Sequence, residues 1–337
     1  MSSPTRAGSV VVIGGGPAGL TASSVLARLG HEVELVERRS GLGGRLSRLA
    51  GLFPDGRPAS AELTPLLGDV LDVEVNVRLS RSVVSVASTG DRFTVELDDG
   101  AAIDAGAIVL ATGLDEVPPG AVPEYGHGLR EGVVSSLELE DMLRIGRVTG
   151  RGGIKPRSVV LVQCSGSRTE RRGVPYCSAL CCPTSVKNAL ALKRLDPGMD
   201  VTVLYIDLRT SGPGQEAMYR EARRAGVRFV RGQPSMVLEK DGQLVVCGEN
   251  TLLRELYELP SDLVVLATGL RQSPSELLFR DELGIHQGTS GFPSRDASIE
   301  GVFLCGSARG PMDLPAAVID ARSCAVEVHL YLEKRKG

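Results

Sequence analysis

Four of the seven cysteines in this chain gather in one stretch of sequence, where their thiolates could hold a metal centre. Cys164 ends an apolar run, and Cys177, Cys181 and Cys182 precede a helical pattern. Thiolates at a helix N-terminus can hold an iron–sulfur cluster, because the positive end of the helix stabilises its negative charge. The spacing also leaves zinc, a disulfide or buried free thiols open, although adjacent cysteines are awkward ligands for one ion.

A glycine-rich turn near the N-terminus has the pattern of a dinucleotide-binding loop. The sequence Gly14-Gly15-Gly16-Pro17-Ala18-Gly19 fits G-x-G-x-x-G and lies between an apolar strand and a helical pattern. Its glycines permit a tight turn and a close approach of the backbone to a pyrophosphate, whose charge the helix N-terminus stabilises. Glu37 ends the next strand, where an acidic side chain can bind the adenosine ribose. The alternative is an ordinary glycine-rich turn.

Strand and helix patterns alternate in both halves of the chain, which predicts an α/β fold with two dinucleotide-binding, Rossmann-like domains. Each half ends in Ala-Thr-Gly-Leu, which indicates a weak internal duplication. An antiparallel hairpin is expected over 83–97. The other expected strands are 9–13, 33–36, 108–110, 159–163, 201–206, 227–230, 263–267 and 302–304, and the expected helices are 17–29, 184–195, 215–225 and 316–332.

Three further stretches resemble the FAD-contacting motifs of flavoproteins with two dinucleotide-binding domains. Residues 37–45 resemble the second stretch, 111–113 the turn over the cofactor, and 301–307 the last motif, in which Ser307 replaces the usual Asp. N–H groups that start the last helix could point at the flavin pyrimidine. The resemblance implies FAD, with contacts beyond the glycine loop from Glu37, Arg38, Gly43, Gly44, Arg45, Leu46, Val84, Ala111, Thr112, Gly113, Gly306, Ser307, Leu314, Pro315 and Ala316.

The expected domain organisation follows from these motifs. Residues 1–114 and 270–337 form a discontinuous FAD-binding domain, and the Gly- and Pro-rich residues 115–154 form a connector. Residues 155–269 form a second Rossmann-like domain that carries the cysteines. The expected architecture is thioredoxin-reductase-like, with three layers and a small antiparallel β meander.

The loop of the second domain does not fit a nicotinamide site. The apolar strand at 159–162 runs into Gln163–Arg168, which has one glycine where a dinucleotide loop needs three. Side chains at the other positions would block close approach of a pyrophosphate. The chain also lacks the C-x-x-C pair of a thioredoxin-reductase-like disulfide.

The same loop resembles the flavoprotein A subunit of heterodisulfide reductases. The resemblance covers 163–168, 176–182 and Lys187, and extends to 205–210, 226–229 and 305–311. The cysteine pattern C-x₁₂-C-x₃-C-C is specific to that family. The resemblance implies a [4Fe–4S] cluster on the four cysteines, close to FAD. It also implies that Lys187 approaches the flavin N5 and tunes its potential, the alternative being a solvated helix lysine.

The chain is shorter than the methanogen subunits and has no C-x-x-C-x-x-C ferredoxin stretch. It therefore resembles the short A subunit of heterodisulfide-reductase-like complexes in sulfur-oxidising bacteria. The resemblance implies a homodimer, B- and C-type partner subunits, a lipoate-binding protein as indirect partner, and electron relay between cluster and flavin. Alternatives are an NAD(P)H-dependent thioredoxin-reductase-like disulfide reductase, or a non-catalytic FAD-bound assembly subunit.

Composition excludes several classes of protein. A net charge of -3 and 4% aromatic residues argue against nucleic-acid binding. No apolar run reaches the length of a membrane span and no signal peptide is evident, so we expect a cytoplasmic protein, where structural disulfides are rare. Cys247, Cys305 and Cys324 are expected to be core thiols, and none of the four histidines is expected to form a metal-binding pair.

Overall fold

The computed structural model describes residues 8–171, 174–273, 283–285, 288, 292–293 and 299–335. The chain divides into two units. Unit 1 consists of Met1–Ser47, Ser60–Asp115 and Gln272–Gly337, and unit 2 of Arg48–Ala59 and Glu116–Arg271. Residues 1–7 and 274–282 of the predicted FAD-binding domain lie outside the described residues.

Unit 1 is built on a parallel sheet with the strand order β18-β7-β1-β2-β3. All five side chains of the central strand are buried, as expected for a parallel strand that is covered on both faces. The strands are β1 (Ser9–Ile13), β2 (Glu32–Glu37), β3 (Val75–Leu79), β7 (Ala107–Leu110) and β18 (Val302–Leu304).

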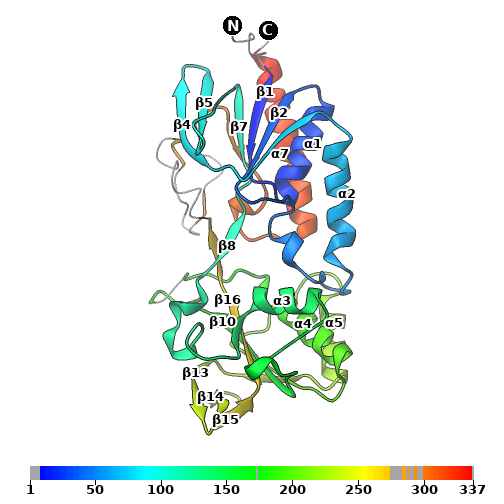
Figure 1. Cartoon of the computed structure of the whole chain (residues 1–337), viewed down its shortest axis with the longest axis vertical. Coiled ribbons are helices and arrows are strands. Elements are labelled where there is room, and N and C mark those ends of the chain that lie inside the picture. The colour runs from blue at the N-terminus through cyan, green and yellow to red at the C-terminus, as the bar shows by residue number, and fades with distance from the viewer. Residues whose placement is uncertain are drawn as a thin grey trace. The chain divides into compact units, whose positions relative to one another are not determined.

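Side chains of β1 alternate between two cores, which gives unit 1 its three layers. Val10 and Val12 pack on the helical side, and Val11 and Ile13 on the side of an antiparallel meander. Figure 1 shows the helices on one face of the sheet and the meander on the other. The helices are α1 (Pro17–Arg28), α2 (Ala59–Leu71) and α7 (Leu314–Lys334), and the meander strands are β4 (Val83–Thr89), β5 (Arg92–Leu97) and β6 (Ala102–Ala105).

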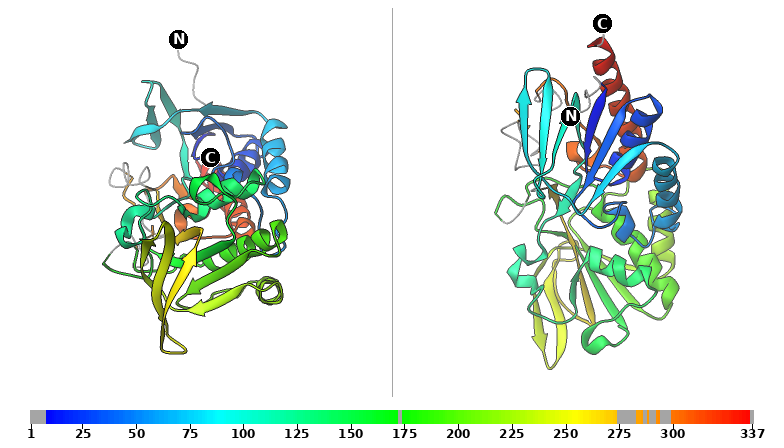
Figure 2. Two further views of the ribbon diagram at one scale, coloured as in Figure 1. Left: turned by 60° about the horizontal axis from the view of Figure 1, so that its bottom comes forward. Right: turned by 45° about the horizontal axis from the view of Figure 1, so that its top comes forward.

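Unit 2 repeats this plan on a parallel sheet with the order β12-β11-β10-β16-β9. The strands are β9 (Val133–Ser135), β10 (Ser158–Ser165), β11 (Asp200–Tyr205), β12 (Arg228–Arg231) and β16 (Leu263–Thr268). Val159 and Leu161 pack against helices, whereas Val160 and Val162 pack against a second meander. Figure 2 shows these layers. The helices are α3 (Ser136–Arg144), α4 (Cys181–Leu195) and α5 (Gln215–Arg224). The meander strands are β13 (Pro234–Lys240), β14 (Gln243–Asn250) and β15 (Glu255–Ser261).

The predicted fold class is confirmed, because each unit has a parallel sheet between helices and a meander. The predicted connector differs from the structure. Residues 116–154 lie in unit 2 and add β9 and α3 to it, the helix being started by a capping box of Ser135 and Glu138. Strands β8 (Leu114–Glu116) and β17 (Leu270–Gln272) pair in a separate two-stranded sheet.

Helix α4 begins earlier than predicted. It starts at Cys181 rather than Thr184, because Pro183 falls in its first turn, where no N–H donor is needed. Cys181 and Cys182 are therefore part of the first helical turn. Helix α2, whose interior holds Pro65, and strand β3 were not predicted.

None of the helices among the described residues is both long enough and apolar enough to cross a membrane.

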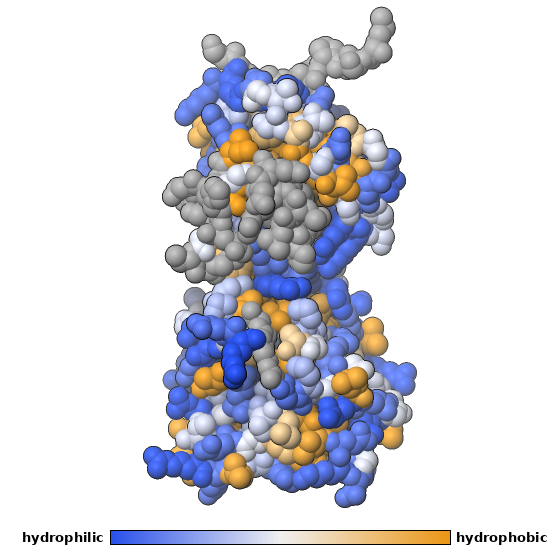
Figure 3. Space-filling view, turned by 90° about the vertical axis from the view of Figure 1, so that its left-hand side faces the viewer, coloured by the Kyte–Doolittle hydropathy of each residue, from blue (hydrophilic) through white to orange (hydrophobic). Residues whose placement is uncertain are grey.

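Large exposed apolar side chains occur in both units, and the face in Figure 3 shows hydrophobic residues scattered among hydrophilic ones. Single exposed apolar residues of this kind are normal on protein surfaces.

The central position of β10 predicts a large stability cost for truncating its core side chain. Leu161 is fully buried, so we expect Leu161→Ala to lower the free energy of unfolding by about 2–5 kcal/mol. The matched control is Leu256→Ala on β15, where the side chain is 87% exposed and the expected change is within about 0.5 kcal/mol. Urea unfolding followed by far-UV circular dichroism measures both, and equal costs would contradict the assigned core.

Candidate functional site

The glycine loop at the end of β1 has a separate physical reason for each motif glycine. A Cβ on Gly14, whose φ is +110°, would collide with the carbonyl of Ala111, and one on Gly19 with the carbonyl of Gly14. A Cβ on Gly16 would meet only Gly44 Cα, 3.9 Å away. The outer two glycines thus allow close backbone packing, whereas Gly16 leaves open the space that a pyrophosphate would occupy.

The N-terminus of α1 is suited to an anion. Its N-cap, Gly16, provides no side-chain hydrogen bond, and the first turn holds no acidic residue. Pro17 is the first helical residue and Ala18 is buried behind it. The first N–H groups and the positive end of the helix dipole therefore face the position of Gly16 with no carboxylate in the first turn of the helix.

The stretch that follows β2 packs against this loop. Gly43 donates its N–H to the carbonyl of Gly15 at 2.7 Å. Gly44 has a φ of +53°, and a Cβ there would lie 2.9 Å from Gly16 Cα. The two glycine stretches thus touch through their backbones and form one cradle in unit 1.

Glu37 is buried beneath the loop. One carboxylate oxygen accepts the N–H of Gly15 at 2.7 Å and the other accepts the N–H of Arg39 at 2.8 Å. These bonds hold the turn in place and leave each oxygen a second lone pair, which a ribose hydroxyl can use.

The predicted last motif lies directly beside α1. Gly306 has a φ of +59°, and a Cβ there would collide with the side chain of Ala18. Its N–H donates to Asp320 Oδ2 at 2.7 Å, and Asp320 also forms an ion pair with Arg309. Ser307, which is half-buried, therefore lies in a short turn fixed against the start of α1.

The start of α7 is already capped, which reduces its capacity to donate to a flavin. Asp313 accepts the N–H of Ala316 at 3.0 Å, and Pro315 has no N–H. Of the three predicted contacts Leu314, Pro315 and Ala316, the last two thus have no free backbone donor. The Asp313 carboxylate also offsets the positive end of the helix dipole.

The other predicted FAD contacts differ in how far they are buried. Leu46 and Ala111 are buried, and Arg45, Thr112 and Gly113 are half-buried. Arg38 pairs with Asp115 at 3.1 Å, and Val84 is 51% exposed on β4.

The four predicted cysteine ligands come from three segments of unit 2. Cys164 lies at the end of β10 in the left-handed region, with a φ of +56°. Cys181 and Cys182 occupy the first turn of α4, which has no side-chain cap and no acidic residue. The thiol of Cys181 donates to the carbonyl of Thr268 at 3.4 Å, and Thr268 pairs in register with Ser165, next to Cys164.

Electrostatic coupling shows that these cysteines are neighbours. The pKa of Cys182 is raised to about 11, chiefly by burial and to a smaller extent by repulsion from Cys164 and Cys177. Burial also raises the pKa of Cys164, against which the Arg168 guanidinium acts. Both groups are thiols near neutral pH, so a metal centre bound there must displace their protons.

Buried polar atoms without partners occur on β10, β16 and α4, the elements that carry or contact the cysteines. Among the described residues, the hydroxyls of Ser165, Thr268 and Ser185 and both amide atoms of Asn188 are buried without a hydrogen-bond partner. Each such atom costs about 1–3 kcal/mol, so several together indicate a site that a further group completes.

Among the described residues, no three cysteine sulfurs lie within 4.8 Å of one another, unlike the thiolates of one tetrahedral zinc ion. Tetrahedral thiolates with bonds of about 2.3 Å lie about 3.8 Å apart. Within the described part of the chain, three potential ligand atoms come within 4.8 Å of one another at His31, His329 and Glu333, and not at the cysteines. A [4Fe–4S] cluster, which binds each thiolate at a different iron, requires the wider spacing.

Lys187 is buried rather than solvated. Its Nζ donates to Glu140 Oε1 at 2.5 Å and to the carbonyl of Gly51 at 2.9 Å, and the side chains of Lys187 and Glu140 are 6% and 1% exposed. The other Glu140 oxygen accepts the N–H of Ala50 at 2.9 Å. Burial lowers the pKa of Lys187, and Glu140 opposes that shift. The pair ties the segment 48–59 to the rest of unit 2.

The structure brings two of the four histidines together, while the expectation that none of them forms a metal-binding pair stays a prediction. His31 and His329, which are 298 residues apart in the sequence, lie 2.9 Å apart between Nε2 and Nδ1. No local spacing could have indicated this pair. His127 binds Glu138 at 2.9 Å, Cys305 and Cys324 are core thiols as predicted, and Cys247 is half-buried.

Comparison with known proteins agrees with the two-unit architecture. The profile of the family described as pyridine nucleotide-disulphide oxidoreductase matches residues 8–160. Thioredoxin reductase from Lactococcus lactis superposes with a TM-score of 0.71 at 21% identity, covering 97% of this chain and 99% of that one. Thioredoxin reductase from T. acidophilum gives 0.70 at 17% identity, covering 97% and 98%. These likenesses show the fold.

Sequence relatives are more specific. The iron–sulfur A subunit of CoB–CoM heterodisulfide reductase from Methanocaldococcus jannaschii is 28% identical over 96% of this chain and 64% of its own length. The A subunit of the H₂:CoB–CoM heterodisulfide,ferredoxin reductase from Methanothermobacter thermautotrophicus is 36% identical over 69% of this chain and 38% of its own. The chain thus spans less than two thirds of the length of these curated relatives.

The open space at Gly16 predicts a selective binding defect. An alanine there has room to fold, since Gly16 has a φ of -77°, but its methyl group would occupy the cradle. We expect Gly16→Ala to weaken FAD binding at least tenfold, or by about 1.4 kcal/mol or more, in a fluorescence titration of the apoprotein. Gly68→Ala on α2, where a Cβ meets nothing within 4 Å, is the control and should bind FAD normally. Normal binding by Gly16→Ala would place the pyrophosphate elsewhere.

The buried ion pair predicts that removing one partner is worse than removing both. We expect Lys187→Met to lower the free energy of unfolding by about 3–5 kcal/mol, because it leaves a buried carboxylate unpaired. Adding Glu140→Met should recover part of that loss. Lys240→Met, which breaks an exposed pair with Glu258, should cost about 1 kcal/mol or less. Denaturant titrations compare these variants, and a double variant less stable than Lys187→Met would contradict the pairing.

Proposed function

Because the chain is a homologue of heterodisulfide reductase A subunits over most of its length, we propose that it is the electron-transfer subunit of such an oxidoreductase complex. It carries FAD in unit 1 and a [4Fe–4S] cluster in unit 2. The observation that supports this most is the convergence of three cysteine-bearing segments at the end of β10, where a second dinucleotide loop would otherwise begin.

The cradle of unit 1 binds FAD in this proposal. Gly14 and Gly19 fix the turn, Gly16 admits the pyrophosphate to the N-terminus of α1, and Glu37 accepts from the ribose. Ser307 stands near the start of α1, where it can donate to a ribitol hydroxyl. Asp313 moderates the positive field at α7, so less of the charge on reduced flavin is offset by that helix.

The proposed cluster ligands are Cys164, Cys177, Cys181 and Cys182. When bound, the cluster exchanges single electrons and FAD accepts pairs, so together they couple one-electron and two-electron partners. The first turn of α4 stabilises the negative charge of the centre. The guanidinium of Arg168, which pairs with Asp207 at 2.8 Å, opposes the rise that burial causes in the pKa of Cys164, and so adds a second positive charge near it.

Lys187 is proposed to tune the flavin potential through its positive charge near N5. The buried carboxylate of Glu140 beside it partly cancels the field of the Lys187 charge at more distant groups. If a Lys187→Met variant binds FAD and the reduction potential of the flavin is unchanged, Lys187 does not have this role, and the rest of the proposal stands.

The biological context that we propose follows the sequence resemblance. The protein works as a homodimer with B- and C-type subunits in cytoplasmic sulfur oxidation, and a lipoate-binding protein supplies the sulfur indirectly.

An NAD(P)H-dependent disulfide reductase is the second candidate, because the fold is that of thioredoxin reductases. The loop after β10 opposes it. A Cβ on Gly269 would lie 2.5 Å from Ser167 Cβ, so a side chain of this loop already fills the space beside Gly269, and Cys164 and Ser165 stand where a dinucleotide loop has glycines.

Metal analysis of protein purified without oxygen tests the proposal. We expect about four irons and four sulfides per chain, and an EPR signal of the reduced cluster that titrates with potential. Cys181→Ser should retain less than about a tenth of the iron, because a cluster with three thiolates is labile. Cys247→Ser, a half-buried cysteine on β14, is the matched control and should keep the full content.

Two results would contradict the proposal. The cluster would be ruled out if the parent protein held less than one iron atom per chain and Cys181→Ser held the same amount. Stoichiometric flavin reduction by NADPH within the mixing time would instead favour the disulfide reductase.

A further inference from the structure

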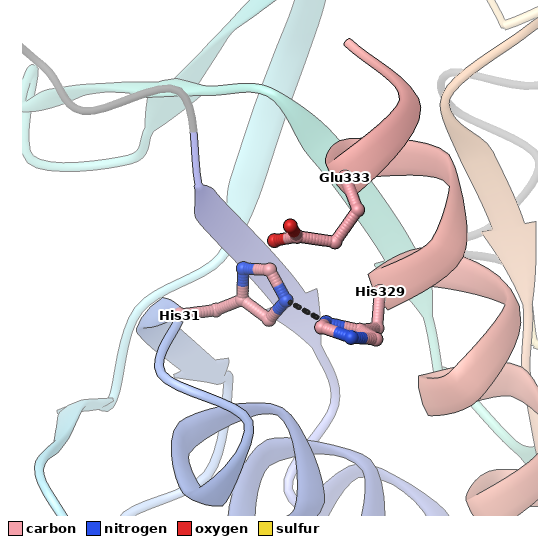
Figure 4. A group of neighbouring side chains, drawn as sticks. All are labelled: His31, His329 and Glu333. Carbon is pink, nitrogen blue, oxygen red and sulfur yellow. Dashed lines mark hydrogen bonds between the residues drawn. The ribbon is translucent and has the colours of Figure 1, made fainter. Parts of the chain in front are cut away.

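Two histidines and a glutamate from distant parts of the sequence meet in unit 1. His31 lies in the turn between α1 and β2, and His329 and Glu333 lie one turn apart on α7. Figure 4 shows both rings and the carboxylate directed toward a common point. One ligand atom from each residue lies within 4.8 Å of the other two.

The separation of the ring nitrogens suits two bonds to one ion. His31 Nε2 and His329 Nδ1 lie 2.9 Å apart. Two imidazole nitrogens at about 2.05 Å from a metal lie about 2.9 Å apart at a right angle and about 3.3 Å apart in a tetrahedron. The spacing of the two nitrogens therefore already suits neighbouring ligands, and each ring turns so that its lone pair points at the ion rather than at the other nitrogen.

Local structure fixes this arrangement. The spacing from His329 to Glu333 places both side chains on one face of α7. Gly30, with a φ of +85°, turns the chain after α1 so that His31 lies next to that face of α7. A Cβ on Gly8 would lie 3.1 Å from His31 Nδ1, so a glycine there leaves room for the ring.

Burial is graded across the group. His31 is 5% exposed, His329 is half-buried and Glu333 is exposed. The nitrogen ligands are thus held by the core, whereas the carboxylate side opens to solvent, from which an ion and its water ligands can enter.

We propose that His31, His329 and Glu333 bind a divalent first-row transition ion of the Zn²⁺ type, with water completing its coordination. Imidazole and carboxylate are ordinary ligands for such ions. The proton of the present His31–His329 hydrogen bond moves to the other nitrogen of its ring or to solvent, so that both facing nitrogens offer lone pairs to the ion.

The ion has a structural role. It joins the last turns of α7 to the turn that links α1 and β2, and so crosslinks the C-terminal helix to the strand-helix-strand motif of the glycine loop. Ala316, near the other end of α7, is about 20 Å away along the helix. The ion is therefore remote from the cradle for FAD and independent of the function proposed above.

Zn²⁺ titration of the protein with its flavin and iron retained, by competition with a chromophoric chelator in the absence of oxygen, tests the site. We expect one Zn²⁺ per chain that His329→Ala weakens about a hundredfold or more and Glu333→Gln about tenfold. His127→Ala removes a histidine that also contacts a glutamate, but in unit 2, and should leave the affinity unchanged. Flavin content and circular dichroism establish that each variant is folded, and the exposed Glu333 gives a variant that leaves the core intact.

Binding that is equal in the parent protein and in His329→Ala would overturn the proposal. The same holds if Co²⁺, bound in place of Zn²⁺, shows sulfur-to-metal charge-transfer absorption, because the ion would then lie at cysteines. Ligand-field bands without that absorption, lost in His329→Ala, are the expected result.

Discussion

The close contact between two backbone segments at the end of β1 determines most of unit 1. Helix α1 can start where it does only because Gly19 lies against the carbonyl of Gly14, with no side chain between them. That contact aims the helix N-terminus at Gly16 and brings Ala18 against Gly306, so that segments from both ends of the chain share one cradle. The anion site is therefore a consequence of backbone packing more than of any polar side chain.

Unit 2 uses the same layers for different chemistry. Its central strand β10 alternates between a helical core and a meander core, as β1 does, but ends in Cys164 in a left-handed conformation. Helix α4 then begins with two cysteines where α1 begins with Pro17 and Ala18. In the function proposed above, the positive end of a helix serves both sites, since it favours a phosphate and an anionic cluster alike. The name of the relative from Methanocaldococcus jannaschii, an iron–sulfur subunit, is consistent with cysteines at the start of α4 in place of Pro and Ala.

Local sequence patterns predicted those strands and helices whose bounds depend on residues close together in the chain. The strands β1 and β18 have the expected bounds, because apolar runs and turn residues delimit them. Helix α4 starts at Cys181 rather than at the predicted Thr184, because Pro183 is tolerated in a first turn. Contacts such as Lys187 with Glu140, or His31 with His329, depend on tertiary packing, and neither residue of such a pair carries a local sign of its partner.

The division of the chain into units has a consequence for biosynthesis. The chain passes between the units four times, at 47–48, 59–60, 115–116 and 271–272. A ribosome has supplied every residue of unit 2 once Arg271 has emerged, whereas unit 1 still lacks β18 and α7. The early residues 48–59 are held by Glu140 and Lys187 of the unit that completes first. During translation, the cysteine-bearing unit therefore has its full set of contacts while the nucleotide-binding sheet is still waiting for its last strand.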